Sequence, residues 1–321
     1  QSGNKYRVSA HDADMKETEA IYGQTDSGMT IIEGHLFLNG KKPIQHRSSY
    51  GLGEVIKAAL DNHTEHLVIS LGGIGSFDGG AGMLQALGAT FYDDEAQIVD
   101  MRKGAYLIKY IRRIDLSGVH PQLTKVNIQL MSDFSSRLYG KKSEIMQTYE
   151  SLDLSQNEAA EIDNLIWYFS ELFKNELKIA MGPIERGGAG GGIAAVLNSL
   201  YQAEILTSHE LVNQITHLEN LIQQADLIIF GEGLKEEDQI LETTTIRIAE
   251  LTQQYSKPAI AICATNDKFD LFESLNVTAM FNTFIDMPDS YTDFKMVIQI
   301  RHYTVQALKL LKTQINLPLS S

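Results

Sequence analysis

The chain has 321 residues, of which 43% are hydrophobic and 21% charged, proportions that suit a globular protein of one large or two smaller domains. Acidic residues outnumber basic ones 41 to 27, giving a formal charge of −14, and no block of Lys and Arg resembles a nucleic-acid footprint. A single cysteine, Cys263, excludes a disulfide framework, and no apolar stretch of about 18 residues predicts a membrane-spanning helix. We therefore expect a cytoplasmic protein that binds a small molecule, and neither nucleic acid nor membrane.

The first 50 residues differ in pattern from the rest of the chain. Short runs of alternating apolar and polar residues at Lys5–Ser9, Glu19–Gly23 and Met29–Glu33 are separated by turn residues. Alternation with a period of two is typical of strands with one buried face. The pattern therefore predicts a small meander of strands.

From residue 51 helical patterns alternate with compact apolar strands. The segments expected up to residue 120 are a helix at Gly53–Leu60, a strand at His66–Leu71 and a helix at Ala81–Leu87, and another apolar run follows at Val126–Met131. The clearest helix begins at Ser155, because Glu158 three residues later completes a capping box and apolar residues from Ile162 to Phe173 share one face. A further helix is expected between the glycine run at 187–192 and Leu200.

The last third of the chain alternates most regularly. A helix starting near Ser208 is expected to bury Leu211, Ile215, Leu218 and Ile222. It is followed by an expected strand at Asp226–Phe230, helix at Gln239–Tyr255, strands at Pro258–Cys263 and Val277–Phe281, and a long helix at Asp293–Leu311. Such alternation predicts βαβ units and a mostly parallel sheet. The expected fold class is α/β, with a Rossmann-like doubly wound domain at 51–111 and 196–321 and an inserted smaller α/β domain at 1–50 and 112–195.

Three glycine-rich turns lie at strand ends or helix starts. They are Gly72–Gly80 directly after the strand HLVISL, Gly187–Gly192, and Gly231–Gly233 directly after the strand DLIIF. Ligands of open parallel sheets bind outside the carboxyl ends of the strands, and glycine lets backbone N–H groups approach an anion closely. Asp78 and Glu232 stand inside two of these turns, where a carboxylate can hold a metal or accept a proton.

The glycine turns by themselves leave the function open. A lone glycine-rich turn is more often only a tight turn, and the spacing fits neither the P-loop nor the Rossmann dinucleotide fingerprint. The residues alone therefore predict an anion or nucleotide site and no particular reaction. A structural protein without a small-molecule site is disfavoured, because three such turns coincide with strand ends.

Five segments in order resemble the bacterial glycerate kinase family. The longest begins at Ser49-Tyr50-Gly51-Leu52-Gly53-Glu54 and continues through HLVISLGG to Asp78-Gly79-Gly80-Ala81-Gly82. The others are Ile114-Asp115-Leu116-Ser117, Gly188-Ala189-Gly190-Gly191-Gly192, Ala225-Asp226-Leu227 and Gly231-Glu232-Gly233. Order and rough spacing agree from about residue 8 to the end of the chain, so the resemblance covers nearly all of it.

The resemblance implies transfer of the ATP γ-phosphoryl group to a hydroxyl of D-glycerate, or of a related hydroxy acid, with Mg²⁺. It implies catalytic roles for Asp78 and Glu232, and metal contacts for Asp78 and Asp133. It also implies that the nucleotide and substrate are lined by Gly72, Gly73, Gly79, Gly80, Gly188, Gly191, Gly192, Gly231 and Gly233. A homodimer is compatible with this interpretation.

The chain also departs from the family pattern. The first strand, an Asp-Ser-Phe-Lys motif and an Asp-Gly-Gly-Glu-Gly turn would all precede residue 1, and a lysine expected after Gly-Glu-Gly is replaced within Thr243-Thr244-Thr245. Lost lysines remove positive charge from the developing phosphate, and electrostatic stabilisation is usually the largest catalytic contribution. Two interpretations therefore stay open: a glycerate kinase with impaired activity, or a non-catalytic homologue that binds a nucleotide or metabolite for regulation.

Overall fold

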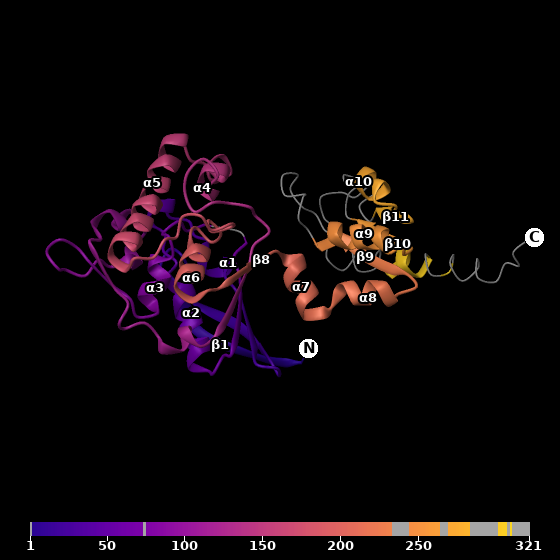
Figure 1. Ribbon diagram of the computed structural model, residues 1–321, viewed down its shortest axis with the longest axis horizontal. Helices are drawn as coiled ribbons and strands as arrows, with labels where there is room; N and C mark the ends of the chain where they lie inside the picture. Colours follow the sequence, from indigo (N-terminus) through magenta and orange to yellow (C-terminus); the bar gives the residue numbers. More distant parts are fainter. Residues whose placement is uncertain are drawn as a thin grey trace, which may run out of the picture. The chain divides into compact units, whose positions relative to one another are not determined.

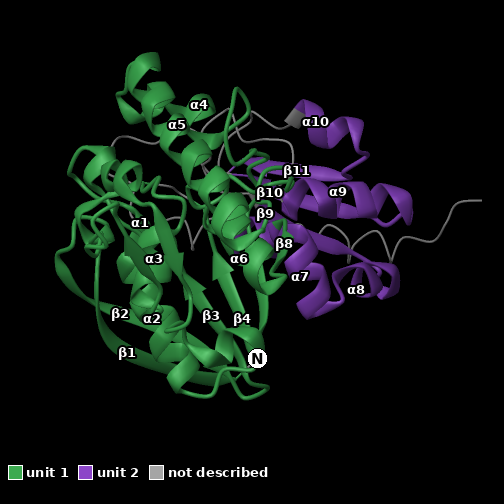
Figure 2. Cartoon of the chain, turned by 60° about the vertical axis from the view of Figure 1, so that its left-hand side comes forward, with its two compact units in different colours: residues 1–207 green, residues 208–321 purple. Residues whose placement is uncertain are grey.

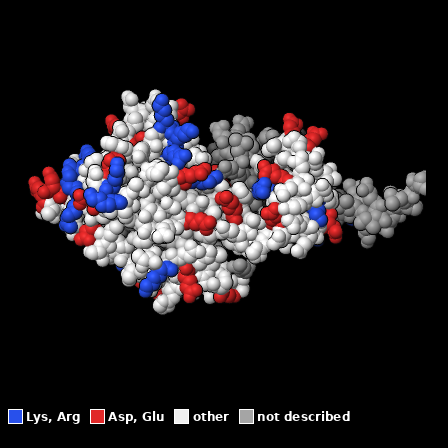
Figure 3. Space-filling view, viewed as in Figure 1, with Lys and Arg blue, Asp and Glu red and all other residues white. Residues whose placement is uncertain are grey.

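The computed structural model describes residues 2–72, 75–232, 244–263, 269–282, 301–306 and 309. The chain divides into two compact units, residues 1–207 and 208–321 (Figures 1 and 2). No helix within those ranges has both the length and the apolar character needed to cross a membrane. Acidic and basic side chains share the face shown in Figure 3 with uncharged surface, so the acidic excess forms no single field there.

Unit 1 is built on a six-stranded sheet with the order β1-β2-β3-β4-β7-β8. Its strands are β1 (Gly3–His11), β2 (Glu17–Thr25), β3 (Met29–Glu33), β4 (His66–Ser70), β7 (Asn127–Met131) and β8 (Glu204–Leu206). The first three strands form the predicted antiparallel meander, whereas β3, β4, β7 and β8 run parallel. The meander prediction is therefore confirmed, and its third strand joins the parallel sheet beside β4.

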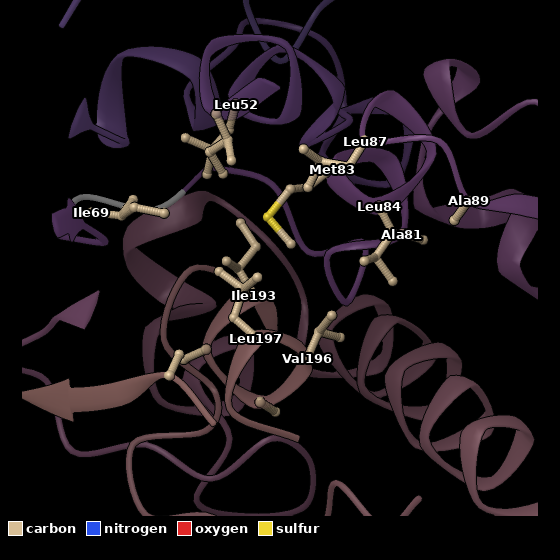
Figure 4. Close-up of a cluster of buried hydrophobic side chains, with 14 of the residues drawn as sticks. Leu52, Ile69, Ala81, Met83, Leu84, Leu87, Ala89, Ile193, Val196 and Leu197 are labelled. Carbon is tan, nitrogen blue, oxygen red and sulfur yellow. The ribbon is translucent and has the colours of Figure 1, made fainter. Parts of the chain in front are cut away.

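A continuous apolar core lies between the sheet and its helices. The helices are α1 (His35–Leu38), α2 (Tyr50–Asp61), α3 (Ala81–Ala86), α4 (Glu144–Thr148), α5 (Gln156–Leu172) and α6 (Ile193–Tyr201). Helix α2 packs on α3 and β1, and α6 packs on β7 and β8. Figure 4 shows Leu52 of α2, Met83 of α3 and Ile193 of α6 converging in this core, where each is fully buried. One core thus holds the three helices together, and two of them, α3 and α6, directly follow the glycine-rich turns.

The long helix α5 begins at the predicted capping box. Ser155 Oγ accepts a hydrogen bond from Glu158 N, and Glu158 Oε2 accepts one from Ser155 N at 2.8 Å. Its apolar face buries Ile162 and Phe169, and the Phe169 ring meets Phe173 edge-on with centroids 4.9 Å apart. The expected helix start and its buried face are both confirmed.

Short elements complete unit 1. Strands β5 (Thr90–Tyr92) and β6 (Arg113–Asp115) form an antiparallel pair outside the main sheet. The 3-10 turns are η1 (Ile44–His46), η2 (Met101–Lys103), η3 (Ala105–Tyr110), η4 (Pro121–Thr124) and η5 (Glu150–Leu152), and a π turn, η6 (Phe173–Leu177), ends α5.

Unit 2 holds a second parallel sheet with the order β11-β10-β9. Its described elements are α7 (Ser208–Thr216), α8 (Leu218–Gln224), β9 (Ile228–Glu232), α9 (Thr244–Gln254), β10 (Ala259–Cys263), α10 (Phe269–Ser274) and β11 (Ala279–Asn282). All five residues of β10, the central strand, are buried, as the apolar run predicts. Residues 301–306 are helical, and the rest of the helix expected at Asp293–Leu311 lies outside the described residues except for 309.

Two expectations in unit 2 need correction. The single helix expected from Ser208 is two helices, because His217 has a left-handed backbone with φ of 52° that breaks the hydrogen-bond ladder. The strand expected at Asp226–Phe230 is shifted by two residues, so Gly231 and Glu232 belong to β9 rather than to a turn after it. Pairing with β10 keeps these two residues in the strand.

The division into units differs from the expected domains. The expected boundaries separate β3 and β7 from β4, whereas β4 pairs with both of them along its whole length. Removing either neighbour would leave the backbone N–H and C=O groups of a buried strand without partners. The strand pairing therefore unites residues 1–50 and 112–195 with 51–111 in one unit.

Candidate active site at two glycine turns

Two of the three predicted glycine turns are packed against each other. We call residues 75–82 together with 187–192 the glycine junction. Gly79 N donates a hydrogen bond to Gly191 O at 3.0 Å, and a Cβ on Gly191 would lie 2.0 Å from Ser76 O. Gly191 also has a left-handed backbone with φ of 62°. Only glycine fits such an approach of two backbones, which explains the residue type at this position.

The glycine junction lies beyond the carboxyl end of the central strand β4. The strand stops at Ser70, and the following backbone is tied to the next strand by a hydrogen bond of 2.9 Å from Leu71 N to Met131 O. A matching bond joins Ser132 N to Leu206 O at 2.9 Å. The carboxyl ends of β4, β7 and β8 therefore stand side by side, which is the edge of a parallel sheet where ligands bind.

The buried carboxylate of Asp78 holds the first turn in place through hydrogen bonds. It is completely buried and accepts hydrogen bonds from Ser49 N, Ser49 Oγ, Gly80 N and Gly82 N at 2.8 to 3.1 Å. Burial raises the pKa of Asp78, and these four donors oppose that rise by stabilising the ionised form. Asp78 thus links the start of α2 to the start of α3 and fixes the backbone of the glycine junction.

Glu144, the first residue of α4, reaches the second turn and was not predicted from the sequence. Its side chain accepts a hydrogen bond from the Gly191 N–H, and burial raises its pKa from 4.5 to about 8. Its Oε2 has no hydrogen-bond partner among the described residues, and neither do the buried Oγ atoms of Ser76 and Ser136. The sequence offered no signal for it, because Glu144 stands in a polar stretch and its burial depends entirely on tertiary contacts.

Other predicted site residues of unit 1 lie around this junction. Gly188 N donates to Ser136 O at 3.4 Å, which joins the second turn to the segment after β7. Gly72 is exposed just after β4, and Gly73 lies outside the described residues. Asp133 is exposed two residues beyond the end of β7, on the same side of the sheet as the turn after β4. The structure thus brings the first and second glycine turns together with Asp78, and places Asp133 near the same sheet edge.

The third predicted turn belongs to unit 2. Gly231 and Glu232 are the last residues of β9, and Glu232 is paired through its backbone register with Cys263 of β10. Gly233 lies outside the described residues. A meeting of Glu232 with Asp78 in one site stays a prediction.

The glycine junction has the local sequence and the position of an anion site. In the described ranges no three side chains of His, Cys, Asp or Glu come together as a metal site. Glycine-rich turns at the carboxyl ends of parallel strands commonly bind phosphates and carboxylates, and the buried Oγ atoms of Ser76 and Ser136 at this one have no partner among the described residues. The glycine junction is therefore a candidate site for an anionic ligand.

Comparisons with known proteins agree with this assignment. A sequence model described as "Glycerate kinase family" matches residues 1–304. The chain is 31% identical over 254 residues to a glycerate kinase of Halalkalibacterium halodurans, covering 77% of this chain and 66% of that protein. It is 29% identical over 236 residues to glycerate 2-kinase of Escherichia coli K12, covering 73% of this chain and 61% of that protein. The chain thus spans less than two thirds of the length of either relative.

A solved structure shows that the similarity extends to the fold. A crystal structure of a candidate glycerate kinase 2 from Salmonella typhimurium LT2 superposes with a TM-score of 0.84 at 25% identity. The match covers 98% of this chain and 84% of that one. The expected α/β class with parallel sheets is therefore confirmed.

Proposed function

The chain belongs to the glycerate kinase family, whose sequence model matches residues 1–304, and we propose that it transfers the γ-phosphoryl group of ATP to a hydroxyl of glycerate. The observation that carries the proposal is the glycine junction, where a Cβ on Gly191 would collide with Ser76 O at 2.0 Å. Glycine-rich turns that follow a strand end and precede a helix are a common place for phosphate groups to bind, which fits ATP.

The reaction makes limited covalent demands on the protein. The substrate hydroxyl oxygen forms a bond to the γ-phosphorus, the bond from that phosphorus to the bridging oxygen breaks, ADP leaves, and the hydroxyl proton passes to a base or to solvent. Catalysis therefore depends mainly on holding the phosphates and the acceptor in line and on neutralising charge. The residues of the glycine junction would hold the phosphates.

Mg²⁺ would accompany the nucleotide. This ion usually keeps several waters and takes one or two carboxylates in addition to phosphate oxygens. We propose Asp133 for this contact, because it is an exposed carboxylate just beyond β7. For Asp78 the four hydrogen bonds favour a positioning role, and its direct contact with the metal or phosphate stays a prediction, as does catalysis by Glu232. We further propose a cytoplasmic protein that acts without nucleic acid, with a homodimer as its candidate assembly.

The alternative function is a non-catalytic homologue that binds a nucleotide or metabolite. It is favoured by the complete burial of Asp78, whose carboxylate is engaged by Ser49, Gly80 and Gly82. A carboxylate in that state maintains a binding loop whether or not phosphoryl transfer follows.

The test is a coupled assay of ADP release with ATP, Mg²⁺ and D-glycerate. We expect turnover above a buffer blank in the unaltered protein and its loss in Asp78→Asn. The matched control is Asp94→Asn, which removes the same charge from an exposed loop and should leave the rate unchanged. Full activity in Asp78→Asn would refute the assignment of Asp78, and ATP binding without turnover in the unaltered protein would support the non-catalytic alternative.

A further inference from the structure

A buried carboxyl group with one unused oxygen lies beside the glycine junction. Glu144 is 5% exposed, and its side chain accepts the Gly191 N–H while Oε2 has no hydrogen-bond partner among the described residues. Removing an ionised carboxylate from water without a compensating charge is costly, so such a group retains its proton. A protonated carboxyl group presents an O–H donor where an ionised one presents only negative charge.

Two neighbouring hydroxyls share this unpaired state. Ser76 and Ser136 are buried, and their Oγ atoms have no partner in the described part of the chain. Both residues contact the second glycine turn through their backbones: Ser76 O lies against Gly191, and Ser136 O accepts the Gly188 N–H. Buried polar atoms are nearly always paired, so three unpaired oxygens from separate segments at one junction indicate groups that a ligand completes.

Among the described residues, no charged side chain contributes to the pKa shift of Glu144; Arg186, which precedes the second glycine turn, has a partner of its own. Helix α4 packs on α5, which carries Asp163. The carboxylate of Asp163 accepts hydrogen bonds from the Gly140 N–H at 2.8 Å and from the Ser143 side chain. Lys142 and Arg137, in the segment before α4, are both exposed. Only burial and the Gly191 N–H influence the pKa of Glu144, and burial prevails.

We propose that Glu144 is a positioning residue of the anion site: its protonated carboxyl group donates from Oε2 to the anion held at the glycine junction, and loss of that proton repels the same anion. The inference deepens the proposed function and rests on it, because the anion is taken to be the phosphate chain of ATP. An ionised Glu144 would place a like charge within the buried site, where little water screens it.

The test is the dissociation constant of Mg–ATP, measured by calorimetry from about pH 6 to about pH 9 on the unaltered protein and on Glu144→Gln. Glutamine keeps the shape and a hydrogen-bond donor but cannot ionise. We expect affinity in the unaltered protein to fall up to about tenfold per pH unit above pH 8 relative to Glu144→Gln. Glu161→Gln, on the exposed side of α5, is the matched control and should follow the unaltered protein.

The outcomes separate this inference from the proposed function. Parallel pH dependence in the unaltered protein and Glu144→Gln, with Mg–ATP bound by both, overturns the role of Glu144 and leaves the kinase assignment standing. Absence of Mg–ATP binding to both proteins at every pH overturns the proposed function and the inference with it. If Glu144→Gln does not fold, binding to the unaltered protein near pH 8 is repeated in buffers of different ionisation enthalpy. Proton uptake on binding supports the proposal, and binding without proton uptake refutes it.

Discussion

Replacement of Gly191 by alanine tests whether the glycine junction is a contact between two backbones. The new Cβ would lie 2.0 Å from Ser76 O and 2.9 Å from Phe77 Cα, both on the buried opposite turn. Backbone atoms cannot rotate away as a side-chain tip can. The two turns would therefore have to separate, which stretches the hydrogen bond from Gly79 N to Gly191 O.

A matched control separates two costs of the substitution: that of placing alanine in a left-handed backbone and that of the steric contact with the opposite turn. Gly140 also has a positive φ, 88°, but a Cβ there would meet nothing within 4 Å. Gly140→Ala should therefore lose only the cost of a left-handed alanine, about 1 kcal/mol. Gly191→Ala adds the cost of overpacking, about 1–3 kcal/mol, and of a weakened buried hydrogen bond, about 1 kcal/mol. We expect Gly191→Ala to be about 3 kcal/mol less stable than Gly140→Ala.

Trp167 makes the assay specific to unit 1. It is the only tryptophan of the chain and lies on α5 with 48% of its surface exposed. Urea unfolding followed by its fluorescence therefore reports the unit that contains both glycines. Equal free energies of unfolding for Gly191→Ala and Gly140→Ala would show that the turns are not in contact, and the argument for the candidate site would fail.

Three further predictions use the same assay. The pKa of Glu144 is raised from 4.5 to about 8 on folding, so the folded state holds the extra proton; the stability it contributes is complete below about pH 4.5 and lost as the pH rises through 8. The unaltered protein should thus lose about 1.4 kcal/mol per pH unit relative to Glu144→Gln between about pH 5 and pH 8, and parallel curves would contradict the burial of this group. Asp78→Asn should cost about 2–4 kcal/mol, because asparagine keeps only one acceptor oxygen and its NH₂ group must face either Gly80 N or the donors at Ser49 and Gly82; an effect as small as that of Asp94→Asn would refute the positioning role. Ser155→Ala should cost about 1 kcal/mol by removing the cap of α5, and no loss would mean that the cap is dispensable.

Local sequence patterns determined many elements of this protein. Alternation in the first residues predicted the strands of the meander, and the Ser155–Glu158 pair predicted the start of α5, because both patterns depend on neighbours a few residues apart. Glycine content identified the turns at 72–80 and 187–192 for a similar reason. A backbone that must adopt unusual angles or approach another closely selects glycine wherever it occurs.

Only the tertiary structure decided how these parts meet. The pairing of β4 with β3 and β7 joins segments that the sequence had suggested for different domains, because hydrogen bonds between strands carry no signature of the partner strand. The break at His217 and the extension of β9 through Glu232 depend likewise on contacts outside the local pattern. Burial decided the chemistry of the carboxyl groups. The sequence motif identified Asp78, but its hydrogen bonds to Ser49 depend on a distant segment of the chain. The raised pKa of Glu144 likewise depends on distant segments that remove water from its carboxyl group.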